Sequence, residues 1–134
     1  MTDEEAMMSI GELAEASGRT PYTLRYYESI GLIPLVERTD AGHRRYRPEH
    51  VDWLRFLGRL RASGMSIQTM KAYAELVAEG RDNLSERRRL LRRHLEEIEE
   101  RREQLRAAER IVHAKLEFYD RLEEDGDAAW SFPD

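Results

Sequence analysis

The sequence has no cysteine among its 134 residues. Disulfides, thiolate metal sites and thiol redox switches are therefore excluded within this chain. No apolar run approaches the length of a membrane span, and the leader from Met1 to Met8 is acidic, unlike a signal or transit peptide. We therefore expect a cytoplasmic protein.

The sequence also lacks the marks of an enzyme. It has no phosphate-binding loop, no nucleophile with a nearby base and no clear set of metal ligands. His94 and His113 could approach each other only across a dimer, and no carboxylate and histidine cluster at i, i+4 accompanies them. We expect His43, His50, His94 and His113 to be solvated, and we expect no metal, cofactor or catalytic activity.

The charge is unevenly distributed along the chain. The formal net charge is −5, yet the stretch from Arg19 to Arg61 holds nine arginines against five acids. A local basic surface of this kind is what contact with nucleic acid phosphates requires. Because 37% of the residues are charged, we expect one small domain with an extended element, buried partly against a partner.

Two short helices are predicted near the amino terminus. Ser9 and Glu12 form a capping box for the first helix, which Ser17 and Gly18 close. The second helix lies between a capping Thr20 with Pro21 at its first position and a closing Gly31. Two short helices joined by a turn are a helix-turn-helix pattern, although many helical proteins contain one without touching DNA.

The second helix has an apolar side and a basic aromatic side. Leu24 and Tyr27 face inward at i and i+3, which leaves Tyr22, Arg25 and Tyr26 facing outward. An arginine with two phenols on a short exposed helix suits hydrogen bonding to base edges and phosphates in a major groove. The alternative is an ordinary amphipathic helix with half-buried tyrosines.

Residues 32–47 predict a short hairpin that turns at 39–42, whose sequence is Thr-Asp-Ala-Gly. One face can hold Tyr46 against the helices while Arg44 near the tip reaches a DNA backbone. A hairpin rich in arginine directly after a helix-turn-helix is typical of a winged helix. The alternative is a solvated charge cluster.

Two further helices follow the hairpin. The first begins at Pro48 and Glu49 and ends at Gly64; the second is capped by Ser66 and ends at Gly80. Arg61 and the loop at 63–66 could touch a second stretch of DNA backbone. Met65 and Met70 are expected to fill the core rather than bind a ligand.

A long helix is predicted from Asn83 to Glu124, about 60 Å at about 1.5 Å per residue. Apolar residues recur every seven positions over five repeats, which predicts a coiled coil. The seam, and thus the predicted dimer interface, consists of Leu84, Leu91, Leu95, Ile98, Arg102, Leu105, Glu109, Val112, Leu116 and Tyr119.

Charge in the seam predicts the direction of pairing. A parallel dimer would bury Arg102 against its own copy, which is costly. Antiparallel pairing about Leu105 sets Arg102 opposite Glu109 of the second copy instead. The remaining tail, 125–134, could fold back through Trp130 and Phe132, or fray. The expected organisation is a disordered leader (1–8), a winged helix-turn-helix domain (9–80), a dimerisation helix (83–124) and this tail.

Four ordered segments together resemble the MerR family of bacterial transcription regulators. They are Ser-Ile-Gly-Glu-Leu-Ala at 9–14, Thr-Leu-Arg-Tyr-Tyr-Glu at 23–28 with Ile-Gly-Leu-Ile-Pro at 30–34, Arg-Thr-Asp-Ala-Gly-His-Arg-Arg-Tyr at 38–46, and Gly-Met-Ser-Ile at 64–67. The resemblance covers roughly residues 8–122. It implies a mainly α fold, a winged helix-turn-helix domain followed by a long antiparallel coiled-coil dimerisation helix.

The resemblance also implies DNA contacts, position by position. From the second helix they are Tyr22, Thr23, Arg25, Tyr26 and Tyr27; from the wing they are Arg38, His43, Arg44 and Tyr46; Arg61 would contact phosphate. Family members bind palindromic promoters as homodimers and control RNA polymerase by bending and untwisting an overlong spacer. Backbone contacts can offset the elastic cost of such a distortion, about a few kcal/mol.

The nearest branch is the one that responds to aldehyde and nitrosative stress, judging from 64–67 and from 73–80. That branch commonly keeps a reactive cysteine in the third helix, where this chain has Arg59. Two explanations stay open for the missing cysteine. The arginine could hold the regulator in one state, or a small-molecule effector could bind between helices.

Two other classes of function compete with a DNA-binding regulator. One is a module that sequesters a small molecule in an aromatic pocket around Trp53, Tyr73 and Trp130, with a secondary DNA role. The other is an adaptor that acts only through its coiled coil.

Overall fold

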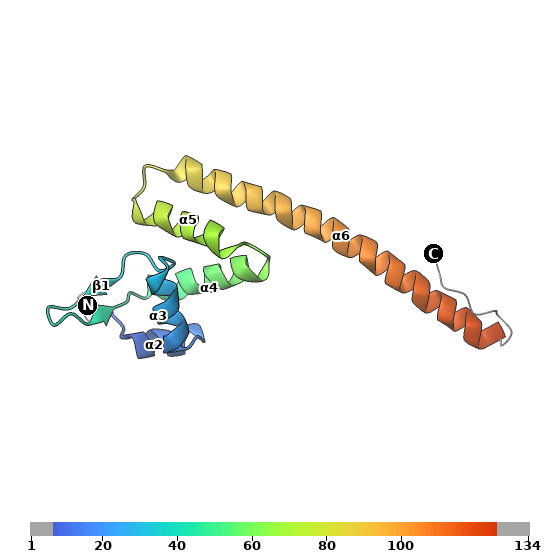
Figure 1. The fold of residues 1–134 in the computed structure, drawn as a ribbon, viewed down its shortest axis with the longest axis horizontal. Helices are drawn as coiled ribbons and strands as arrows, with labels where there is room; N and C mark the ends of the chain where they lie inside the picture. Colours follow the sequence, from blue (N-terminus) through green and yellow to red (C-terminus); the bar gives the residue numbers. More distant parts are fainter. Residues whose placement is uncertain (1–6, 126–134) are drawn as a thin grey trace. The chain divides into compact units, whose positions relative to one another are not determined.

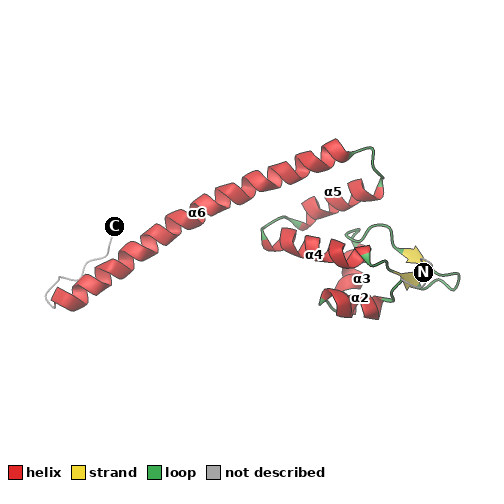
Figure 2. Ribbon diagram, turned by 180° about the vertical axis from the view of Figure 1, so that it is seen from behind, coloured by secondary structure: helices red, strands yellow, loops and turns green. Residues whose placement is uncertain are grey.

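The computed structural model describes residues 7–125 and shows helices with one small sheet (Figures 1 and 2). The elements in order are α2 (Ile10–Ser17), α3 (Pro21–Ser29), β1 (Glu37–Arg38), β2 (Arg44–Arg45), α4 (Glu49–Ala62), α5 (Ile67–Ala78) and α6 (Leu84–Asp125). This order confirms the predicted winged helix-turn-helix with a long helix after it. Trp130 and Phe132 of the tail lie outside the described residues.

Local capping fixes the two helices of the helix-turn-helix. The Ser9 hydroxyl accepts the Glu12 N–H at 3.2 Å, and the Glu12 carboxylate accepts the Ser9 N–H at 3.3 Å. Gly18 ends α2 in the left-handed region at φ 72°, a conformation that glycine adopts without strain. Thr20 then caps α3 by accepting the Thr23 N–H at 3.1 Å. The predicted capping box and N-cap are both confirmed.

The wing is a two-stranded antiparallel sheet in which Arg38 lies opposite Arg44. Gly42, at φ 85°, permits the tight reversal, and its N–H donates to the Thr39 carbonyl at 2.8 Å. Met8 extends this sheet, because its N–H donates to the Tyr46 carbonyl at 2.6 Å and its carbonyl accepts the Tyr46 N–H at 2.8 Å. The prediction that the leader runs to residue 8 is therefore wrong at Met8, which belongs to the wing.

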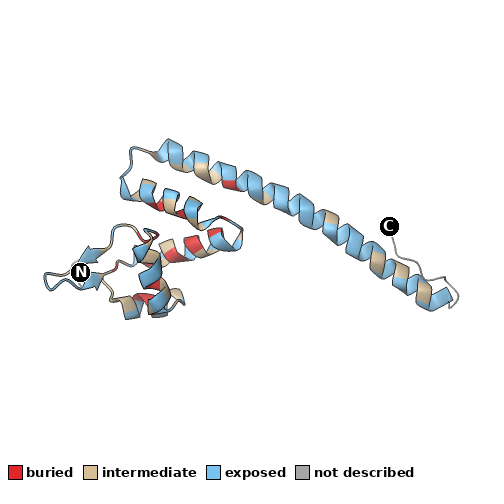
Figure 3. Ribbon diagram, viewed as in Figure 1, coloured by how far each residue is buried: buried red, intermediate tan, exposed pale blue. Residues whose placement is uncertain are grey.

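One hydrophobic core joins the helices and the wing (Figure 3). Its largest fully buried side chains come from α2, α3, the following loop, the wing, α4, the turn after it and α5: Leu13, Leu24, Leu32, Tyr46, Leu54, Leu57, Met65 and Met70. The prediction that both methionines fill the core is confirmed.

Two histidines are buried, contrary to the expectation that all four are solvated. His50 is 6% exposed, and its Nδ1 accepts the Arg47 N–H at 2.9 Å while its Nε2 lies 2.8 Å from the Pro34 carbonyl. His94 is 5% exposed, with Nε2 2.8 Å from Ser63 Oγ. Each imidazole has a polar partner for Nε2, which is what makes burial of such a group tolerable.

The junction between α5 and α6 is built by side-chain bonds to the end of α5. Asn83 Nδ2 donates to the Leu76 carbonyl at 2.8 Å, and Arg87 donates to the same carbonyl at 3.2 Å and to that of Gly80. Leu90 packs against the core. One compact unit of the chain ends at His94, and a second begins at Leu95. The first turns of α6 therefore belong to the same unit as the helix-turn-helix and the wing.

None of the helices within residues 7–125 is long and apolar enough to cross a bilayer. Within the same residues, no three histidine or acidic side chains are grouped as metal ligands.

Candidate nucleic-acid interface

Helix α3 presents polar and aromatic side chains to solvent. Tyr22 is 80% exposed and Tyr26 is 50% exposed, and Arg25 is exposed between them. Leu24 anchors the opposite side of the helix, since it is fully buried in the core. The outward face predicted from the sequence is therefore present, with hydrogen-bond donors of the kinds that read base edges and phosphates.

Tyr27 lies at the edge of this face and is half-buried. Its hydroxyl accepts a hydrogen bond from Arg19 Nη1 at 3.4 Å, and the Arg19 guanidinium lies 5.5 Å from the ring centroid. Arg19 Nη2 also donates to the Leu54 carbonyl of α4 at 3.3 Å. Tyr27 thus serves the packing between the helix-turn-helix and α4.

The wing is attached to α3 through one carboxylate. Glu28 Oε2 accepts the Arg44 Nε–H at 2.7 Å and the Tyr46 hydroxyl at 2.9 Å. Tyr46 itself is 0% exposed. The sequence-based expectation that Tyr46 contacts DNA therefore needs correction, because its buried hydroxyl is bonded to α3, whereas its predicted packing against the helices is confirmed.

These contacts change the acid–base properties of the wing. Burial and then the Glu28 carboxylate raise the pKa of Tyr46 to about 12, because both disfavour a phenolate. The hydrogen bond and charge of Glu28 likewise raise the pKa of Arg44 above its ordinary value. Tyr46 is therefore a neutral donor and Arg44 a cation at any physiological pH.

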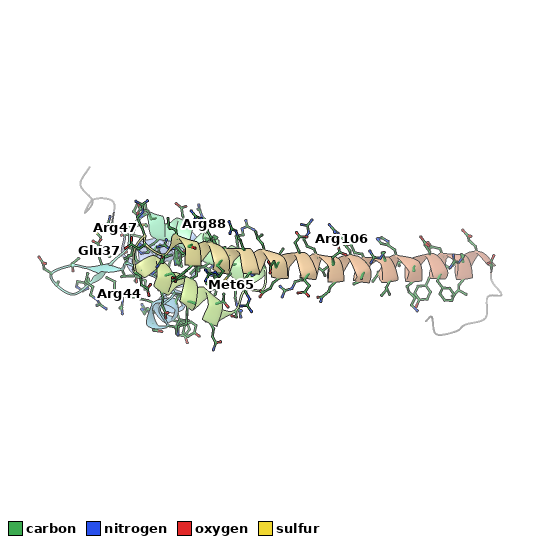
Figure 4. All side chains as sticks on the ribbon, turned by 90° about the horizontal axis from the view of Figure 1, so that it is seen from above. Glu37, Arg44, Arg47, Met65, Arg88 and Arg106 are labelled. Atoms are coloured by element: carbon green, nitrogen blue, oxygen red, sulfur yellow. The ribbon has the colours of Figure 1, made fainter. Side chains whose placement is uncertain are left out.

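A second ion pair, between Arg47 and Glu37, stabilises the wing. Arg47 Nε donates to Glu37 Oε1 at 2.9 Å, and Figure 4 shows the two side chains next to each other beside the wing. Arg38 Nη1 donates to the Gly42 carbonyl at 3.1 Å across the turn. Arg38, Arg44 and Arg47 are thus held by acids or backbone of their own domain, which limits how far their side chains can move.

A hollow of about 350 Å³ opens between α2, α3 and the wing. Four cationic or potentially cationic side chains line it with the amino-terminal end of α2; the lining residues are Ser9, Ile10, Arg25, Gly42, His43, Arg44 and Arg45. A concave surface of this composition suits an anionic backbone such as that of DNA.

Arg61, near the end of α4, is exposed and donates from Nη1 to the Met65 carbonyl at 3.3 Å. This bond steadies the turn between α4 and α5, where the sequence predicts a second contact with DNA backbone. Arg59, at the position where the family resemblance implies a cysteine, is also exposed.

The seam of α6 is apolar but exposed in the single chain. Its exposed apolar members within the described residues are Leu84, Leu95, Leu105, Val112, Leu116 and Tyr119, while Leu91 and Ile98 are half-buried. Arg102 and Glu109 are exposed as well. Such an apolar stripe requires a partner to cover it in water.

Comparison with known proteins decides the family. The model of the MerR HTH family regulatory protein matches residues 8–77, and the MerR DNA-binding model matches residues 51–114. The chain belongs to the MerR family. It is a DNA-binding transcription regulator of the MerR type, as the sequence predicted.

Curated relatives support this membership of the MerR family. The transcriptional regulator AdhR of Bacillus subtilis is 40% identical over 63% of this chain and 60% of its own length. An HTH-type transcriptional regulator of Haemophilus influenzae is 34% identical over 79% of this chain and 78% of its own length. Both relatives are HTH-type transcriptional regulators.

Solved MerR family structures share the fold. One is HiNmlR, a MerR family regulator lacking the sensor domain and bound to promoter DNA, with a TM-score of 0.75 and 31% identity over 90% of this chain and 95% of that one. Another is a regulator of Listeria monocytogenes, with a TM-score of 0.79 and 34% identity over the same 90% and 95%.

Of the predicted contacts, the structure brings Arg25, His43 and Arg44 around one hollow. It also shows residues that sequence reasoning missed. Ser9 and Arg45 line the hollow, and Glu28 attaches the wing to α3. Arg45 could have been found because it lies two positions after His43, and residues two apart on a strand share a face. Glu28 had no such signal, since its partners are distant in sequence.

Proposed function

We propose that this protein binds a palindromic promoter as a homodimer and distorts the spacer to control RNA polymerase. The observation that carries the proposal is the capped, exposed face of α3 next to the cationic hollow of the wing. HiNmlR, a similar regulator of nearly the same length, is bound to promoter DNA.

The proposed contacts are those that the surface makes available. Tyr22, Thr23, Arg25 and Tyr26 would enter the major groove, and Arg38, His43, Arg44, Arg45 and Arg61 would contact the backbone. Tyr27 would touch DNA at most with its ring edge, because its hydroxyl is bonded to Arg19. Tyr46 is left out because it is buried.

The proposed dimer pairs two copies of α6 in antiparallel fashion. Residues 87–93 contain five arginines and no acid, whereas 117–125 contain five acids and one arginine. Antiparallel pairing brings these oppositely charged ends together, whereas parallel pairing sets like charges against each other. This charge asymmetry supports the direction predicted from Arg102 and Glu109.

The absence of native cysteine makes the direction of pairing directly testable. In a variant carrying both Arg102→Cys and Glu109→Cys, mild oxidation should link position 102 of one copy to position 109 of the other. The single variant Arg102→Cys is the control and should not cross-link. Efficient cross-linking of the single variant would refute antiparallel pairing.

DNA binding is tested by selecting genomic fragments with the purified protein and titrating the selected site with salt. Arg44→Ala should weaken binding and lower the salt slope by roughly one, because one cation near the phosphates is removed. Arg110→Ala, an exposed arginine on α6 outside the seam, is the matched control. A protein with no preference for any palindrome over random DNA would refute the proposed function.

A second candidate function is binding of an apolar small molecule. A pocket of about 410 Å³ is lined by Pro34, Leu35, Trp53 and Val77 with several polar residues, and Trp53 stacks on Tyr73 at 5.7 Å. Binding of 1-anilinonaphthalene-8-sulfonate without DNA, lost in Val77→Arg, would support it. Unchanged dye binding in that variant would exclude this pocket.

A further inference from the structure

Glu28 is the acid of α3, and it lies on the side of the helix that meets the wing. Its Oε2 accepts both the Arg44 Nε–H at 2.7 Å and the Tyr46 hydroxyl at 2.9 Å. Its side chain is only 16% exposed, and that of Arg44 is 40% exposed. One oxygen atom thus joins α3 to two residues of the wing.

A carboxylate at this place opposes DNA binding by its charge. It sits beside a surface that must approach phosphates, where any negative charge lowers the attraction. Replacement by a neutral residue would strengthen contact with DNA of any sequence. The acid therefore needs a different physical explanation, and its two bonds to the wing provide one.

We propose that Glu28 is a positioning residue for sequence specificity, which fixes the wing to α3 so that both engage DNA as one rigid unit. The inference rests on the proposed function. With its Nε on Glu28, Arg44 has its two terminal amino groups left to donate to a phosphate. That phosphate contact is formed only when α3 lies at the correct register in the groove, so DNA that places α3 incorrectly loses it.

The same geometry explains why Tyr46 is a tyrosine. Its ring fills the core of the wing, and its hydroxyl holds the Glu28 carboxylate from the buried side. Arg44 holds the same oxygen from the exposed side. The carboxylate cannot turn away from the wing without breaking two hydrogen bonds, one of them charge-assisted.

The test is Glu28→Gln, which preserves the shape and an acceptor oxygen but removes the charge. Binding to random DNA should strengthen, with a salt slope steeper by about one, because Arg44 is no longer neutralised. The ratio of specific to random binding should nevertheless fall roughly fivefold, as expected for losing a partly exposed ion pair. Glu15→Gln, an exposed acid on α2, is the control and should leave the ratio unchanged.

A double-mutant comparison shows whether Glu28 acts through Arg44. In the Arg44→Ala background, Glu28→Gln should no longer lower the specificity ratio, because the group that Glu28 positions is gone. Tyr46→Phe is the second variant, since it removes only the buried hydroxyl. It should lower the ratio without strengthening random binding.

The outcomes separate this inference from the proposed function. If wild type prefers its site but Glu28→Gln leaves the specificity ratio unchanged, the positioning role is wrong and the proposed function stands. If Glu28→Gln lowers specific and random binding equally, the residue serves only the fold, and the inference is again overturned. If wild type shows no site preference, the proposed function itself fails.

Discussion

The glycine at position 58, inside α4, offers a test of how the helix-turn-helix is attached to the rest of the domain. A β-carbon added there would lie 2.6 Å from Arg19 Nη2. The Arg19 guanidinium would have to move, and it would then lose its bond to the Leu54 carbonyl and its place over the Tyr27 ring. The variant Gly58→Ala therefore tests whether Arg19 occupies this space.

Two opposing effects determine how much Gly58→Ala changes the free energy of unfolding. Alanine is favoured over glycine inside a helix by about 1 kcal/mol. The long hydrogen bonds of Arg19 and its cation–π contact together contribute about 2 kcal/mol. Gly58→Ala should thus destabilise the wild type by about 1 kcal/mol, yet stabilise an Arg19→Ala background by about 1 kcal/mol.

Urea unfolding followed by circular dichroism measures both changes, at one fixed protein concentration because the dimer equilibrium contributes to stability. Gly11→Ala on α2 is the control, since its β-carbon would come no closer than 3.9 Å to the Ser9 hydroxyl oxygen. It should behave alike in both backgrounds. A stabilising effect of Gly58→Ala in the wild type as well would refute the proposed position of Arg19.

Three further changes have expected outcomes. The pKa of Tyr46 is raised to about 12, so the stability that the protonated phenol contributes is intact below about pH 10 and is lost as the pH rises through 12. The free energy of unfolding should therefore fall less steeply between about pH 10 and 12 in Tyr46→Phe than in the wild type, and equal pH dependence in the two proteins would contradict the buried phenol. Asn83→Ala should cost about 1 to 2 kcal/mol because it leaves the Leu76 carbonyl with one donor fewer, and an unchanged urea midpoint would argue against the junction described. Thr20→Ala should cost about 1 kcal/mol through loss of the cap on Thr23, whereas Thr20→Ser should cost little; equal losses would show that the hydroxyl is not the cap.

Local features of the fold could be predicted because neighbouring residues decide them. The capping residues Ser9 and Thr20 act within three positions of themselves. Gly42 sets a turn of four residues. The heptad repeat of α6 can be recognised in the sequence without any information on tertiary contacts. These signals were enough to predict the order of the helices and the wing.

Contacts between distant segments could not be predicted in the same way. Arg44 and Glu28 carry no pattern that pairs them, and the approach of Arg19 to the Leu54 carbonyl depends on how α4 packs on the first two helices. The burial of His50 and His94 has the same cause, because a histidine is solvated or enclosed according to its tertiary neighbours. The sequence therefore predicts both burial in the core and a DNA contact for Tyr46, and only the tertiary packing shows that the residue is buried.

The charge of the candidate interface differs from what a count of arginines suggests. Arg44 is paired with Glu28 and Arg47 with Glu37, so neither pair adds net positive charge to the surface. Counterion release follows the net positive charge brought to the phosphates. The attraction must then come mainly from arginines outside these two pairs, such as Arg25. We therefore expect this regulator to bind random DNA weakly for its arginine content. Such weakness would widen the difference in affinity between its own site and the competing sequences of a genome.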